Sequence, residues 1–134
     1  THKPLHYWIK PRPNKKDQTM STVTDDQKTV VALDEVIAKL DMAAPIPFSL
    51  EHAEEDLILG LYKPQSPDEQ SPHEQDEYYF VARGNGEISV NGVIEAFTTG
   101  DALFVPAGAD HGFLNTSADF YCWVIFYGPK FEIG

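Results

Sequence analysis

Three shortages limit what this chain can be. Its 134 residues include one cysteine, Cys122, which excludes an internal disulfide and a zinc site built from several cysteines. No apolar run approaches the ~20 residues that a membrane-spanning helix needs. Basic residues are also few, because 10 Lys and Arg stand against 21 Asp and Glu. Nucleic acids and anionic membranes attract concentrated positive charge, so we expect neither as a partner and expect a soluble cytoplasmic protein.

The charge is unevenly distributed along a chain whose length suits one domain with its own core. Residues 1–19 contain five basic residues and one acidic residue, a net of +4, so the other 115 residues sum to −15. This stretch has three prolines and lacks the period of a helix or a strand. We interpret residues 1–19 as a basic leader or non-native extension, with Met20 as a start. The alternative is a basic arm that packs on a neighbouring subunit.

One short helix is predicted within the N-terminal segment, residues 20–43. Apolar side chains recur there three and four positions apart and form a single stripe: Leu33, Val36, Ile37 and Leu40. Pro45 and Pro47 prevent the helix from continuing. We expect it to cover one side or one end of the remaining domain, residues 44–134.

From about residue 46 onward the pattern is that of β-strands. Short apolar or alternating runs recur roughly every ten residues, with glycine, asparagine and proline between them, at residues 57–62, 77–82, 87–90, 93–98, 102–105, 112–115 and 120–127. Asn91-Gly92 is the favoured two-residue turn of a β-hairpin. No strand–helix alternation is visible, so the pattern predicts an all-β sandwich or barrel with one minor helix.

Two histidines and a glutamate are the candidate metal ligands. His73 and Glu77 lie four positions apart, so they share a face if the chain is extended there, and Gln75 and Tyr79 share that face too. His111 lies far along the chain on another predicted strand. If the two strands are neighbours, two imidazoles and one carboxylate meet. That ligand set suits Fe(II) and also admits Mn, Ni, Zn or Cu, while leaving positions open for water or substrate.

Other polar residues have ordinary interpretations beside the functional ones. A lone histidine is more often a surface or hydrogen-bonded residue than a ligand, and the remaining three histidines are interpreted in that way. Cys122 is expected to be a buried apolar filler rather than a ligand. Arg83 is expected on a surface turn rather than in a pocket. Residues 68–72 are expected to form an exposed approach loop, whose negative charge disfavours polyanionic substrates.

The spacing of these residues resembles that of the cupins, in particular their small single-domain members. The second cupin motif, G-x5-P-x-G-x2-H-x3-N, is met at every fixed position, by Gly100, Pro106, Gly108, His111 and Asn115. The first motif, G-x5-H-x-H-x3-4-E-x6-G, is met only in its latter part, by His73, Glu77 and Gly84. Gln65 replaces its leading glycine, and Ser71 replaces its first histidine. The resemblance covers about residues 44–134.

The resemblance implies a double-stranded β-helix, a barrel of two antiparallel sheets with a metal inside one mouth. Its ligands carry over to His73, Glu77 and His111, with Gln75 as a weak ligand or the holder of a water molecule. Three ligands instead of four imply a more open site. Tyr79 is expected to point inward above the metal as the candidate for catalytic proton transfer, with plain core packing as the alternative. Small cupins commonly pair, so a homodimer is expected.

These inferences predict a metal-binding small cupin that acts on a small organic molecule. The favoured activity is that of a metal-dependent oxidoreductase of the dioxygenase type, with Fe(II) as the favoured metal. An isomerase or lyase that uses the same metal is one alternative. A non-catalytic barrel that binds a small molecule is the other.

Overall fold

The computed structural model describes residues 29–42, 47–65, 68 and 72–128. One helix comes first, α3 (Leu33–Met42), and the strands follow in the order β1 (Phe48–Glu54), β2 (Leu57–Tyr62), β3 (Asp76–Arg83), β4 (Asn85–Val90), β5 (Val93–Thr98), β6 (Ala102–Val105), β7 (His111–Leu114) and β8 (Tyr121–Tyr127). The predicted leader at residues 1–19 lies outside the described residues. Within the described part of the chain, no helix is long and apolar enough to cross a membrane.

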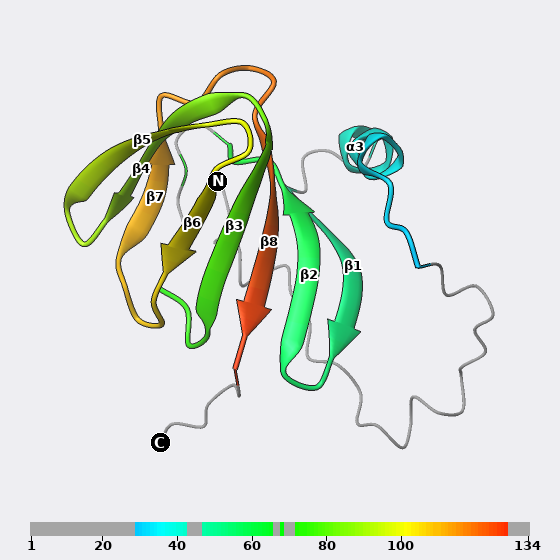
Figure 1. The fold of residues 1–134 in the computed structure, drawn as a ribbon, viewed down its shortest axis with the longest axis horizontal. Helices are drawn as coiled ribbons and strands as arrows, with labels where there is room; N and C mark the ends of the chain where they lie inside the picture. Colours follow the sequence, from blue (N-terminus) through cyan, green and yellow to red (C-terminus); the bar gives the residue numbers. More distant parts are fainter. Residues whose placement is uncertain (1–28, 43–46, 66–67, 69–71, 129–134) are drawn as a thin grey trace.

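The strands form two antiparallel sheets. The larger has the order β1-β2-β8-β3-β6, and the smaller has the order β5-β4-β7. The chain crosses between the sheets after β3 and then at every connection from β5 to β8, so the two sheets lie against each other as the walls of a barrel (Figure 1). The predicted all-β fold is therefore confirmed. Strand β1 was not among the strands predicted from the sequence.

Alternate side chains of the strands fill the space between the sheets. On β3, Glu77, Tyr79 and Val81 are buried while Tyr78 and Phe80 are exposed, the period expected of a strand with one face in the core. On β8, the side chains that face the interior of the barrel are those of Cys122, Val124 and Phe126. The sequence did not indicate which face of this strand is buried. Rings from both sheets meet in the centre: Tyr62, Tyr79, Phe97, Phe113 and Phe120.

Helix α3 covers part of the outer face of the large sheet (Figure 1). Val36 and Leu40 from its predicted apolar stripe are buried against Leu61 and Tyr121. The hydroxyl of Tyr121 donates a hydrogen bond to Asp41 at 2.8 Å. This second, smaller cluster explains why Leu61 is fully buried although it points away from the barrel interior.

The turns explain why the second motif contains the residues it does. Gly100 and Gly108 have φ values of 94° and 81°, and Asn115 has a φ of 50°, so three fixed positions adopt backbone conformations that most side chains avoid. The predicted hairpin is also confirmed, because Asn91 and Gly92 have φ values of 50° and 87° between β4 and β5, as a type I′ turn requires.

Candidate metal centre

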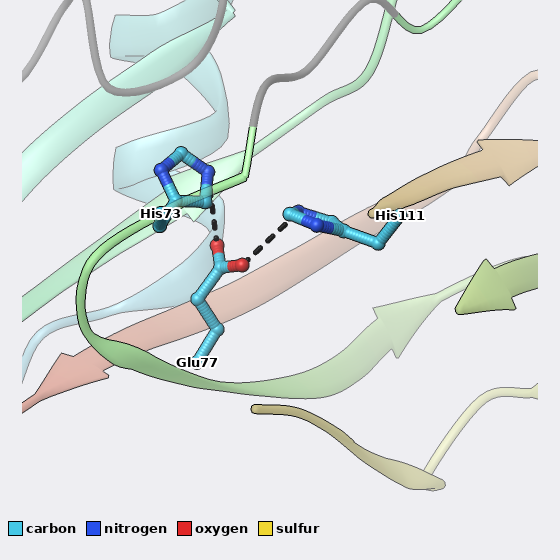
Figure 2. Close-up of side chains that lie close together, drawn as sticks. All are labelled: His73, Glu77 and His111. Carbon is cyan, nitrogen blue, oxygen red and sulfur yellow. Dashed lines mark ion pairs between the residues drawn. The ribbon is translucent and has the colours of Figure 1, made fainter. Parts of the chain in front are cut away.

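Three buried side chains from separate parts of the chain meet inside the barrel (Figure 2). Glu77 points inward from β3, and His111 is the first residue of β7 in the opposite sheet. His73 precedes β3 by three residues. Their side chains are 5%, 1% and 0% exposed for His73, Glu77 and His111, so all three are withdrawn from bulk water. The structure thus brings together the three ligands expected from the sequence.

The local path of the chain at His73 differs from the sequence expectation. A bend at residues 74–75 separates His73 from β3, so His73 and Glu77 do not lie on one strand as predicted. Backbone contacts hold the bend in place, because the carbonyl of His73 accepts a hydrogen bond from the N–H of Gly108 at 2.7 Å. The carboxylate of Asp76 accepts a second one from the N–H of Ala107 at 2.9 Å. These bonds place His73 beside the loop that leads into His111.

Gln75 lies on the same bend. Its amide nitrogen donates to the carbonyl oxygen of Gly128, just past the end of β8, at 2.5 Å. The expectation that Gln75 shares a strand face with His73 and Glu77 fails because the chain is not extended there. The described contact of Gln75 is therefore with the backbone after β8.

Glu77 bridges the two imidazoles. Nε2 of His73 lies 3.5 Å from Oε2 of Glu77, and Nε2 of His111 lies 3.0 Å from Oε1. One ligand atom from each of the three residues lies within 4.8 Å of the others. Two ligands at right angles on a metal with bonds of about 2.1 Å are about 3 Å apart. The spacing of the two histidines around the carboxylate is consistent with one shared ion.

Hydrogen bonding at His111 shows that this donor set fits a cation. Nδ1 lies 3.0 Å from the carbonyl oxygen of Ala109, so the Nδ1–H donates there and a neutral ring carries its lone pair on Nε2. That lone pair faces Oε1 of Glu77. Within the described residues, Oε1 is buried and receives no well-formed hydrogen bond. Two facing lone pairs repel unless a proton or a metal ion lies near both, so the geometry suits a divalent ion.

The titration behaviour of the pair agrees with this geometry. Burial raises the pKa of Glu77, although contact with His111 and the hydrogen bond from Tyr79 oppose that shift. For His111, burial acts to lower the pKa, but the adjacent carboxylate of Glu77 outweighs it and raises the pKa above the usual 6.5. Without a metal, the pair therefore holds a proton more tightly than a free imidazole does.

Tyr79 lies next to Glu77 on the inward face of β3 and is completely buried. Its hydroxyl donates a hydrogen bond to Oε2 of Glu77 at 3.0 Å. Burial, followed by the nearby charge of Glu77, raises the pKa of the phenol well above 10. The hydroxyl consequently stays protonated and remains a donor that orients the carboxylate. The ring itself packs edge-on against Phe113, with the centroids 5.0 Å apart.

Asp68 is the residue near the site that sequence reasoning missed. It was expected in an exposed loop, but its carboxylate accepts a hydrogen bond from the hydroxyl of Tyr62 at 2.5 Å and another from the N–H of Phe113 at 2.8 Å. The negative charge of Asp68 also contributes, as a smaller cause, to the raised pKa values of Glu77 and His111. No motif marks this position, since Asp68 lies between Gln65 and Ser71, the two departures from the first motif.

Cys122 is buried and Arg83 is exposed, as expected, although Arg83 is the last residue of β3 rather than part of a turn. His2 and His6 lie outside the described residues. Cys122 is completely buried, and burial raises the pKa of its thiol well above 9. Its Sγ lies 3.8 Å from the carbonyl oxygen of Tyr62, so it fills the core. Arg83 lies at the surface and pairs with Asp34 of helix α3.

Comparison with known proteins identifies the family. The family model for the cupin domain matches residues 59–126, about half of the chain. The matched range includes His73, Glu77 and His111. An uncharacterised protein of Streptomyces coelicolor, SCO3923, is 37% identical over 79 residues, which cover 58% of this chain and 75% of that protein. The metal centre predicted from the motifs thus lies inside the matched region.

Solved structures agree on the fold. A candidate mannose-6-phosphate isomerase of Ralstonia eutropha is 21% identical, with a TM-score of 0.52 over 61% of this chain and 82% of its own. HppE in an Fe(II) form is 15% identical, with a TM-score of 0.51 over 60% of this chain and 48% of its own. At these identities the likeness concerns the fold alone. Together with the match of the family model, it shows that the chain belongs to the cupin family.

Proposed function

We propose that this cupin binds one divalent transition metal through His73, Glu77 and His111 and is a metal-dependent oxidoreductase of the dioxygenase type. The observation that carries the proposal is the buried Oε1 of Glu77, which lies 3.0 Å from an imidazole nitrogen and accepts no well-formed hydrogen bond from the described residues. Two imidazoles and one carboxylate are the ligand set that non-haem Fe(II) favours, and Mn, Ni, Zn or Cu also fit it.

A metal held by three protein ligands would have further positions for small ligands and would supply Lewis-acid or redox chemistry there. The chain contributes the surroundings. Tyr79 holds Oε2 of Glu77 in place, and its phenol is the proton-bearing group next to the proposed ligands. The burial of all three ligand side chains would exclude bulk water from the reaction. The substrate would be a small organic molecule.

Fe(II) is our favoured metal because of the ligand set, and the Fe(II) form of HppE is a precedent for iron within this fold. The runner-up activity is that of an isomerase, since a candidate sugar-phosphate isomerase has a similar fold. The negative charge of Asp68 beside the centre argues against a phosphorylated substrate here.

The test is consumption of dioxygen. The Fe(II)-loaded protein would be incubated with a set of small phenols, thiols, diketones and hydroxy acids, in air and without oxygen, while an oxygen electrode records uptake. Glu77→Gln, which keeps the size of the side chain, is the matched control. The proposal predicts uptake that depends on one compound and is lost in the variant. No compound-dependent uptake, together with isomerisation that proceeds equally without oxygen, would reject the oxidoreductase in favour of the isomerase.

A further inference from the structure

The ligand His111 lies on a strand with little support of its own. Strand β7 has four residues and occupies the edge of the small sheet, where β4 is its partner. The N–H of Phe113, two residues after His111, points away from β4, because it donates to a side chain on the other side. A short edge strand that carries a metal ligand needs a second attachment to hold its position.

Asp68 provides that attachment. One oxygen of its carboxylate accepts a hydrogen bond from the N–H of Phe113 at 2.8 Å, and the other accepts one from the hydroxyl of Tyr62 at 2.5 Å. Tyr62 is buried and belongs to β2 of the large sheet. A single carboxylate thus joins the free edge of β7 to the opposite wall of the barrel.

The connection continues to a second proposed ligand, Glu77. The ring of Phe113 packs against Tyr62 with centroids 6.2 Å apart and against Tyr79 with centroids 5.0 Å apart, and Tyr79 donates to Glu77. Asp68 also lines, with His111 and Phe113, a cavity of about 670 Å³ along the edge of β7. Movement of the strand into this space would displace His111 from Glu77.

We propose that Asp68 is a positioning residue of the metal centre, which fixes His111 by tying the edge of β7 to Tyr62. This inference rests on the proposed metal site. The proposed role depends on the two acceptor oxygens that the Asp68 side chain offers, and not on its negative charge. Partners that orient a metal ligand typically change metal affinity by 10–100-fold when they are removed, and we expect a loss in that range here.

Two substitutions separate shape from charge. Asp68→Ala removes both acceptors. Asp68→Asn keeps an oxygen that accepts from Phe113 and adds an amide that can donate to the hydroxyl of Tyr62, so it retains the connection without the charge. Positioning therefore predicts a large loss in the alanine variant and recovery in the asparagine variant, whereas attraction of the cation by charge predicts a loss in both.

The matched control is Glu87→Ala. Glu87 lies on β4, in the same sheet, and accepts a hydrogen bond from the side chain of Asn115 at 2.8 Å, just after β7. The substitution therefore also removes one negative charge and one acceptor next to this strand. It differs from Asp68→Ala because Glu87 has no described contact with the opposite sheet.

The experiment uses Co(II) as the probe, with affinity measured by chelator competition and ligand geometry by the visible absorption of the bound ion. We expect Asp68→Ala to bind Co(II) 10–100-fold more weakly with an altered spectrum. Asp68→Asn and Glu87→Ala should stay within about threefold of the wild type, with its spectrum. Thermal unfolding of each apoprotein reports whether the variants are folded. If Asp68→Ala does not fold, Tyr62→Phe, which removes one of the two bonds, should weaken binding by about three- to tenfold.

Two results would overturn the inference. Folded Asp68→Ala, or Tyr62→Phe in its place, with wild-type affinity and spectrum would show that the connection does not position His111. An asparagine variant as weak as the alanine variant would assign the effect to charge. A wild-type protein that binds no Co(II) would reject the metal centre itself, which distinguishes failure of the proposed function from failure of this inference.

Discussion

Replacement of Tyr79 by phenylalanine isolates the contribution of one hydrogen bond to the metal centre. The hydroxyl donates to Oε2 of Glu77 at 3.0 Å, while the ring packs against Phe113 and would stay in place. A hydrogen bond to a charged group is worth about 1.5–3 kcal/mol. Loss of an orienting partner typically weakens metal binding by 10–100-fold, which is about 1.4–2.7 kcal/mol. The two magnitudes agree, so we expect Tyr79→Phe to bind metal at least tenfold more weakly.

The assay is chelator competition with Co(II) at several pH values. The hydrogen bond from Tyr79 opposes the raised pKa of Glu77, so its removal should raise that pKa further and enlarge the defect as the pH falls. Tyr121→Phe is the matched control, because its hydroxyl also donates to a carboxylate, that of Asp41, but on helix α3 outside the barrel. Affinity within twofold of the wild type for Tyr79→Phe at every pH would refute the role given to this hydroxyl.

Three further predictions concern pH and packing. Because the pKa of His111 is raised above 6.5, protons should already compete with the metal above pH 6.5, and affinity should fall as the pH is lowered; constant affinity between pH 5 and 8 would contradict histidine ligation. In the metal-free protein, a lower pH should instead be favourable to folding. Because its pKa is raised, His111 adds to the free energy of unfolding below pH 6.5, and this contribution is lost as the pH rises through the raised pKa; urea unfolding measures it. A Cβ at Gly60 would lie 2.2 Å from the ring of Phe48 and 2.6 Å from the carbonyl oxygen of Ser49, so Gly60→Ala should lower the free energy of unfolding by about 1–3 kcal/mol; a value unchanged in urea unfolding would contradict this packing.

The strands and the meeting of His73, Glu77 and His111 were predictable because residue types and their spacing along the chain indicate both. Alternation fixes which side chains of β3 are buried, and the Asn91-Gly92 turn fixes the register of β4 with β5. The second motif was informative because its glycines mark turns with positive φ, including Gly108, whose N–H holds the carbonyl of His73. The sequence therefore predicted which three side chains meet.

The missed features depend on contacts between distant segments. The bend before β3 is held by Gly108 and Ala107, more than thirty residues later, so the spacing of His73 and Glu77 could not show it. Asp68 was predicted to be a charged residue of an exposed loop. Its hydrogen-bond partners, Tyr62 and Phe113, belong to two different sheets, so the residues next to Asp68 in the sequence could not indicate them. The homodimer stays a prediction.

Metal analysis of the purified protein tests the central claim most directly. Wild-type protein and the double variant His73→Ala, His111→Ala would be loaded with Fe(II) or Co(II), desalted, and measured by mass spectrometry for metal and for protein. We predict one ion per chain in the wild type and none in the folded double variant. One ion per chain in both proteins would contradict a centre formed by His73, Glu77 and His111.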